Sequence, residues 1–203
     1  MRFLRLFCLG LLALAAGAQS IPRAVENRYN PLRTLRVEFQ ETVSYGGRIR
    51  RQERGTLYLL RPGKMRWEYT QPAGKLFVSD GKTFYLYSPH SNQVQRLKPR
   101  ETEDLRAPLA FLLGRLDFSK EFGPVTVRTT PDEITLTALA RSDREPFTEA
   151  VFTIVPRTWQ IRSVAVTGLD GMLTEFLFGD EKVNPPLEAR LFRFEPPAGA
   201  EVP

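Results

Sequence analysis

Hydrophobic and polar residues alternate along most of this chain with the period of two that is typical of half-buried β-strands. In the first such stretch the apolar side chains fall at Leu35, Val37, Phe39 and Val43. Similar stretches recur between turn residues. Together they predict β-strands at residues 35–43, 48–61, 65–69, 75–79, 83–88, 92–97, 125–129, 134–139, 149–155, 161–167 and 174–178.

Turn residues join several of these strands in the manner of antiparallel hairpins. Gly46-Gly47 tolerates positive φ at both central positions of a tight turn. Asp80-Gly81 and Asp170-Gly171 are strong short-range hairpin signals. A large antiparallel sheet can curl around a core and remain open on one side. The sequence therefore predicts a mainly β fold built on a single curved antiparallel sheet.

Two segments have the pattern of helices instead. Residues 24–29 predict a short helix, which Asn30-Pro31 ends because proline disfavours helix continuation. Residues 101–114 have acidic residues in the first turn and Gly114 at the end, as the helix dipole and the C-cap favour. Their helical face carries Leu109, Leu112 and Leu113. This apolar helix could cover the open side of the sheet.

The N-terminus has the three parts of an export signal. Arg2 and Arg5 precede an apolar run over residues 6–15, and Ala16-Gly17-Ala18 satisfies the small-x-small cleavage rule. The run is well short of the ~20 residues that span a bilayer. We predict a cleaved signal peptide at 1–18, a single domain over 19–203, and a soluble exported protein. Its one cysteine, Cys8, would leave with the signal, so the mature chain would have no thiol or disulfide.

The chain is basic, with 29 Lys+Arg against 23 Asp+Glu, a net +6. Without Arg2 and Arg5 the balance is 27 minus 23, or +4. An exported protein does not meet nucleic acid, so this charge serves either solubility or contact with anionic membranes and acidic partners. The densest group is Arg48, Arg50, Arg51 and Arg54. It is interpreted either as a solvated strand edge or as a docking surface for an acidic patch on a membrane transporter.

Residues suited to catalysis are almost missing from the sequence. His90 is the only histidine and lies in the turn Pro89-His90-Ser91, where a solvated role is expected. No nucleophile elbow, zinc-binding His-Glu-x-x-His or phosphate loop is present. The acidic group Glu101, Glu103 and Asp104 is better explained as a helix N-terminus. We predict no catalytic residue, no metal, no cofactor and no enzyme activity.

A set of short motifs in fixed order gives a more specific indication. Their residues are Gly55-Thr-Leu57, Arg61-Pro62, Trp67, Gln71-Pro72, Ser79-Asp80-Gly81-Lys82, Gln93-Val94 and Phe192-Arg-Phe194-Glu-Pro-Pro-Ala-Gly199. This order resembles the outer-membrane lipoprotein carrier proteins, the LolA-like family. The resemblance implies an incomplete β-barrel with a small α-helical lid. It departs in segment 95–115, which does not match the family closely.

The resemblance also implies a role and partners. The protein would be a periplasmic chaperone that binds the acyl chains of lipoproteins and carries them to the outer membrane. It would receive acylated lipoproteins from an inner-membrane ATP-binding-cassette release complex and pass them to an outer-membrane lipoprotein acceptor, where one exists. We expect a monomer. A regulatory or sensor domain of the same fold, binding a lipid or signalling protein, is the alternative, and a hydrolase is disfavoured.

Large apolar residues on the predicted strands would line an acyl-chain cavity. Each one alone is better explained as ordinary core, and only the set favours a cavity; the sequence leaves open which strand face points inward. The set comprises Phe39, Leu57, Leu59, Trp67, Phe77, Phe84, Tyr87, Ile134, Leu136, Phe152, Val164 and Phe176.

Arg61 ends a strand on the same face as Leu57 and Leu59, where a charge is costly unless it is hydrogen-bonded. The alternative is a strand-end arginine whose head group reaches solvent. The resemblance implies that this arginine bonds to the lid and holds it closed. Carbonyls at the end of the 109–114 helix are the expected acceptors.

Overall fold

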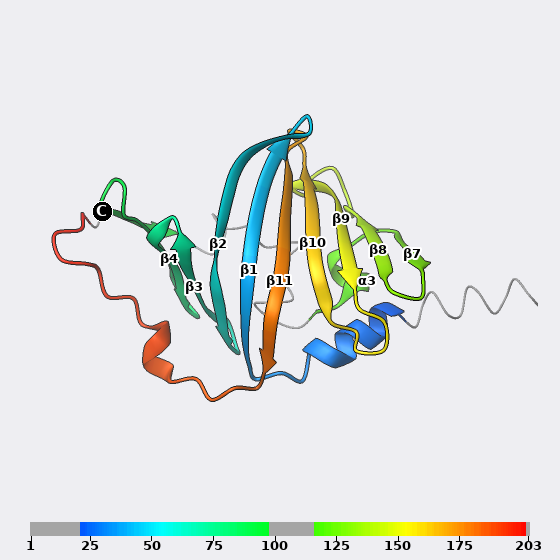
Figure 1. Ribbon diagram of the computed structural model, residues 1–203, viewed down its shortest axis with the longest axis horizontal. Helices are drawn as coiled ribbons and strands as arrows, with labels where there is room; N and C mark the ends of the chain where they lie inside the picture. The colour runs from blue at the N-terminus through cyan, green and yellow to red at the C-terminus, as the bar shows by residue number, and fades with distance from the viewer. Residues whose placement is uncertain (1–20, 98–115, 202–203) are drawn as a thin grey trace, which may run out of the picture.

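The computed structural model describes residues 21–97 and 116–201, which form one antiparallel sheet flanked by short helices (Figure 1). The eleven strands follow the order β6-β5-β4-β3-β2-β1-β11-β10-β9-β8-β7. Their bounds are β1 Thr34–Tyr45, β2 Arg48–Leu60, β3 Lys64–Gln71, β4 Ala73–Asp80, β5 Phe84–Ser88, β6 Gln93–Leu97, β7 Val125–Thr129, β8 Ile134–Leu139, β9 Phe147–Ile154, β10 Ile161–Gly168 and β11 Leu173–Val183. The sheet is not closed, because β6 and β7 at its two ends do not pair with each other.

The predicted fold class is confirmed, and each predicted strand has its counterpart in the sheet. The largest difference is β11, which continues to Val183 instead of ending at residue 178. Its polar second half lacks alternation, but pairing with β1 down to Leu35↔Val183 holds it in the sheet. The predicted signal peptide at 1–18 and the predicted helix at 101–114 lie outside the described residues.

The described helices are a segment over 21–29, α3 at Phe118–Glu121 and the 3-10 helix η2 at Ala189–Phe192. The first starts three residues before the predicted 24–29, since Ile21 also packs against the core, and it ends at the predicted Asn30. Four residues are too few to show a helical period, so α3 and η2 were not predicted. No helix in the described ranges combines the length and hydropathy that crossing a bilayer requires.

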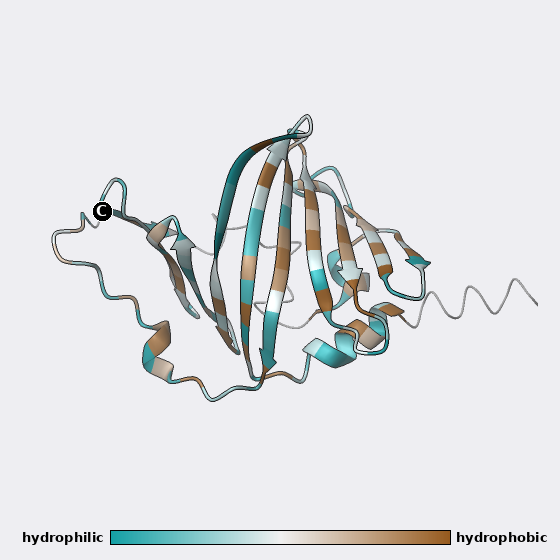
Figure 2. Cartoon of the chain, viewed as in Figure 1, coloured by the Kyte–Doolittle hydropathy of each residue, from teal (hydrophilic) through white to brown (hydrophobic). Residues whose placement is uncertain are grey.

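The core lies against one face of the sheet, which we call the inner face. Apolar and polar positions alternate along β1, β11 and β10 (Figure 2), and the apolar ones are those buried on this face. The helix over 21–29 and α3 pack on the same side. Phe118 of α3 lies 5.2 Å from the ring of Phe152 on β9, and Phe122 lies 5.7 Å from it. The helices thus cover the inner face near β9.

After β11 the chain crosses β3, β4 and β5 on the face opposite the core and ends beside β6 (Figure 1). Phe194 stacks on Tyr85 with ring centroids 4.8 Å apart, and Arg66 Nη1 donates to the Leu191 carbonyl at 3.2 Å. At the edge strand, the Val94 amide donates to the Glu201 carbonyl at 2.8 Å. The C-terminal segment therefore covers the outer face of this half of the sheet.

Candidate functional site

The large apolar residues of the sheet gather into one continuous surface on the inner face. Trp67 is the centre of this surface, with its ring 4.7 Å from Phe39 and 5.7 Å from Phe176, both edge-on. In the strand register it lies between Leu57 and Phe77. Of the residues predicted to line a cavity, the core contains Phe39, Leu57, Leu59, Trp67, Phe77, Phe84, Ile134, Leu136, Phe152, Val164 and Phe176.

Tyr87 was predicted on this surface, and its place in the register corrects that prediction. Leu86 pairs with the buried Phe77 and packs against the core, so Tyr87, its neighbour on β5, points to the outer face. Its hydroxyl donates to Asn92 Oδ1 at 3.0 Å in the turn that follows. Phe84 and Tyr87 are three residues apart and cannot share a face of one regular strand.

Arg61 is half-buried directly after β2, beside the end of the helix over 21–29. Its Nη1 donates to the main-chain carbonyl of Asn30 at 3.2 Å. Burial lowers the pKa of the Arg61 guanidinium. The acceptor is a carbonyl at the end of the helix over 21–29. The contact of Arg61 with the 109–114 helix stays a prediction. The 109–114 segment, with Leu109, Leu112 and Leu113, lies outside the described residues.

The same helix end holds the chain that follows residue 115. Asn30 Oδ1 accepts from the Leu116 amide at 2.7 Å, and its Nδ2 donates to the Leu116 carbonyl at 2.9 Å. One turn earlier, Glu26 Oε1 accepts from the Phe118 amide at 2.9 Å. Asn30 therefore contacts both Arg61 and the start of the segment that leads into α3. This role of Asn30 was not predicted, because Asn30-Pro31 was interpreted only as the end of a helix.

A buried tyrosine fixes the other side of this helix to the sheet. Tyr29 donates to Glu181 Oε2 at 2.7 Å and accepts from the Ile161 amide at 2.9 Å. Arg28 makes an ion pair with the other oxygen of Glu181. Burial raises the pKa of the Tyr29 hydroxyl, so it stays protonated and can donate. The helix that receives Arg61 is thus anchored on β10 and β11.

Charged side chains interrupt the apolar inner face at one corner. Glu41 and Glu53 are directly opposite each other on β1 and β2, and both are nearly inaccessible. Arg51 lies 3.0 Å from Glu41, while Lys75 of β4 lies 2.5 Å from Glu53. Burial raises the pKa of Glu41, against the opposing effect of Arg51. The sequence signal was available: Glu41 follows Leu35, Val37 and Phe39 at the same alternation.

The arginine group of β2 divides between two environments. All four are exposed, but Arg51 pairs with the buried Glu41, whereas Arg48, Arg50 and Arg54 make no ion pair in the described ranges. His90 is exposed in the turn between β5 and β6, as predicted. In the part of the chain that the structure describes, no group of three or more His, Cys, Asp or Glu residues could hold a metal ion.

Comparison with known proteins places this architecture in a family. A family model described as outer membrane lipoprotein carrier protein LolA matches residues 30–195. An outer-membrane lipoprotein carrier protein of Dechloromonas aromatica is 32% identical over 200 residues, covering 96% of this chain and 92% of its own. One from Chromohalobacter salexigens is 31% identical over 191 residues, covering 94% and 88%.

Solved structures with little sequence identity share the fold. An uncharacterized conserved protein from Thermus thermophilus has a TM-score of 0.53 at 17% identity, covering 91% of this chain and 96% of its own. The MucA/MucB complex from Pseudomonas aeruginosa contains a chain with a TM-score of 0.52 at 12% identity. That match covers 86% of this chain and 60% of the other.

Proposed function

Because this chain belongs to the family of outer-membrane lipoprotein carrier proteins, we propose that it binds the acyl chains of lipoproteins released from the inner membrane and carries them through the periplasm to the outer membrane. The observation that supports this most is the continuous apolar inner face, centred on Trp67, within that family's fold. Export would follow from the signal peptide proposed at 1–18.

The inner face suits a cargo of acyl chains. Each CH₂ group removed from water is worth roughly 0.8 kcal/mol, so a lipoprotein cannot cross an aqueous compartment with its chains exposed. An open sheet with aromatic rings and aliphatic side chains offers a comparable apolar surface. Such a surface binds by area and not by a specific polar contact, which suits a carrier of many lipoproteins.

Release requires a cover that opens, and we assign Arg61 to it as the latch. Its bond to Asn30 O connects β2 to the helix over 21–29, whose Asn30 side chain holds Leu116. Acyl chains entering the inner face would separate the helix end from Arg61 and favour the open state. The proposed cover includes the apolar 101–114 segment with Leu109, Leu112 and Leu113.

The proposed partners follow from this route. An inner-membrane ATP-binding-cassette release complex would load the carrier, and an outer-membrane lipoprotein acceptor would unload it. The carrier would act as a monomer and catalyse no reaction. A regulatory or sensor domain of the same fold is the second candidate, since the fold is shared with a chain of the MucA/MucB complex.

The test is release of an acylated lipoprotein from inner-membrane spheroplasts by the purified mature protein. The wild type is expected to bring the lipoprotein into a soluble complex. Arg61→Leu is expected to take up cargo but to fail at passing it to outer membranes, because the open state is no longer disfavoured. Arg54→Leu, an exposed arginine in the middle of β2, is the control and should transfer normally.

If neither wild type nor Arg61→Leu releases any lipoprotein, carriage is wrong and the regulatory candidate replaces it. If wild type and Arg61→Leu transfer cargo equally well, carriage stands and the latch is wrong.

A further inference from the structure

Two turns lie side by side at one end of the sheet, where β1 meets β2 and where β10 meets β11 (Figure 1). The register places Ser44 of β1 between Ile49 of β2 and Leu173 of β11. A Cβ built on Gly171 would lie 3.7 Å from Tyr45 Cε2, so the tyrosine ring lies close to the second turn. The two turns therefore form a single protruding surface.

Apolar side chains are exposed on this surface to an unusual degree. Tyr45 is 50% exposed, Ile49 61%, Leu169 63% and Leu173 39%. They are four of the seven large hydrophobic residues that are exposed in the described chain. Single exposed apolar residues need no explanation, but a group at one protruding end marks an interaction site. We call these residues, with Arg48 and Arg50, the hairpin tip.

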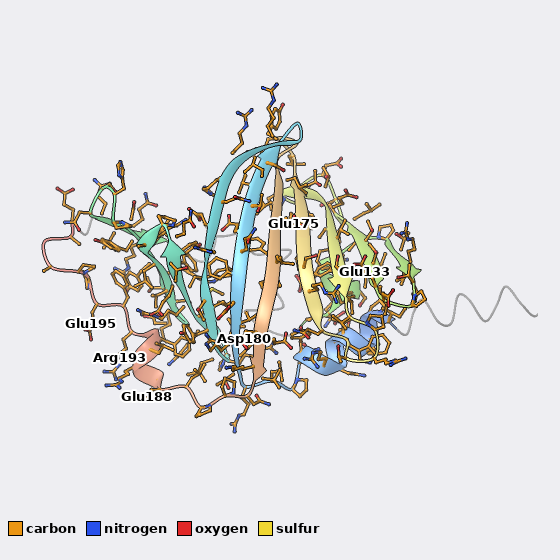
Figure 3. The ribbon with its side chains drawn as sticks, in the orientation of Figure 1. Glu133, Glu175, Asp180, Glu188, Arg193 and Glu195 are labelled. Carbon is orange, nitrogen blue, oxygen red and sulfur yellow. The ribbon has the colours of Figure 1, made fainter. Side chains whose placement is uncertain are left out.

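The charge at the hairpin tip is positive. Arg48 and Arg50 are exposed, and neither makes an ion pair with another residue in the described ranges. The acid within these two turns is Asp170, whose carboxylate accepts from the Met172 amide at 3.0 Å. Glu175 lies farther down β11 (Figure 3), where its partner on β1 is Thr42. The hairpin tip therefore carries two exposed arginines together with its exposed apolar side chains.

We propose that the hairpin tip docks the protein on an anionic membrane surface. Tyrosine, isoleucine and leucine side chains would enter the headgroup layer, and Arg48 and Arg50 would bind the lipid phosphates. A stable protein partner would need roughly 20–30 residues on each side, far more than this convex tip offers. The inference goes beyond lipoprotein carriage and does not depend on it.

The position of the hairpin tip gives the docking a direction. The tip and Arg61 lie at opposite ends of β2, a strand of 13 residues. At ~3.3 Å per residue this separates them by about 40 Å. A protein docked by its tip therefore holds the Arg61 end away from the membrane.

The experiment measures co-sedimentation of the mature protein with vesicles of phosphatidylethanolamine and phosphatidylglycerol, and with phosphatidylcholine vesicles. Binding to the anionic vesicles alone, weakened by salt, is expected. Ile49→Ser with Leu169→Ser, and separately Arg48→Glu with Arg50→Glu, should each weaken binding at least about tenfold. Leu177→Ser and Arg54→Glu, exposed elsewhere on the sheet, are the controls and should bind as wild type does.

Absence of wild-type binding to anionic vesicles overturns the proposal, as does an equal loss in tip and control variants. Recovery of an acidic protein that binds the tip while vesicles do not would replace the membrane as the occupant. Uptake of a soluble acyl probe should be unchanged in every tip variant. If the wild type takes up no acyl probe, lipoprotein carriage is contradicted instead. Failure of membrane docking and failure of carriage are therefore distinguishable.

Discussion

Asn30 holds the main chain of Leu116 from both sides, with its amide oxygen accepting at 2.7 Å and its amide nitrogen donating at 2.9 Å. The backbone carbonyl of the same residue receives Arg61 at 3.2 Å. One residue at a helix end therefore joins β2 to the chain that follows residue 115. A side-chain amide suits this task because it carries one donor and one acceptor in fixed geometry.

Replacing Asn30 with alanine should loosen this junction. Leu116 is 2% exposed, so its amide and carbonyl would lose their partners without gaining water. The expected loss in the free energy of unfolding is on the order of 1–3 kcal/mol, with faster amide hydrogen exchange at Leu116. Asn30→Asp keeps only the acceptor, so its free energy of unfolding should lie between those of the wild type and Asn30→Ala. Unchanged exchange in Asn30→Ala would contradict the assigned role.

Replacing Gly55 with alanine should separate β2 from β3. An added Cβ would lie 2.0 Å from Glu68 O and 2.8 Å from Glu68 C, both rigid backbone atoms. We expect a loss of about 2 kcal/mol or more in urea unfolding, or failure to fold. Gly179→Ala is the matched control in β11, because nothing lies within 4 Å of its added Cβ. Equal stability of the two variants would refute the close approach of Glu68.

Replacing Glu41 with glutamine should change how stability depends on pH. Burial raises the folded-state pKa of Glu41 above the ordinary 4.5, so in that window the folded protein binds more protons than the unfolded chain. Its contribution to stability therefore increases as pH falls through the raised pKa, and is lost as pH rises through it. The gain of Glu41→Gln over wild type should be larger at pH 7 than at pH 4.

Urea unfolding at a series of pH values measures this difference. Glu38→Gln, on the opposite face of β1 with its side chain 57% exposed, is the control and should show no such trend. A Glu41→Gln gain that grows toward acid pH would reverse the sign and reject the explanation.

The strands were predictable because a strand buried on one face has an apolar residue at every second position, as from Leu35 to Phe39. The side of Tyr87 was not predictable, since the three aromatic residues of β5 lie on both faces and leave the inward face undecided until β4 supplies the register. The buried position of Glu41 was also not predicted, for a different reason. Its alternation with Leu35, Val37 and Phe39 places it inside, but its charge argued against burial, because the residue that pairs with it, Arg51, comes from the neighbouring strand.

The contact of Arg61 with Asn30 was not predicted from the sequence. A charge beside Leu57 and Leu59 calls for an acceptor, and a helix C-terminus is a suitable one. That Asn30 supplies one depends on how residues 21–30 fold back on the sheet, through Tyr29 and Glu181. That pair is 152 residues apart in the sequence. No local pattern indicates a contact over such a separation.

The C-terminal segment leaves the two edges of the sheet unequal. Its bonds at Asn92 and Val94 already occupy the start of β6, whereas in the described chain β7 pairs on one side alone. Edge strands invite further strands, and a sheet open at both ends can polymerise. Here strand addition is directed to β7. Two copies meeting there would form a symmetric pair in which each β7 covers the other, so strand addition at this edge would end in a closed pair instead of continuing into a fibre.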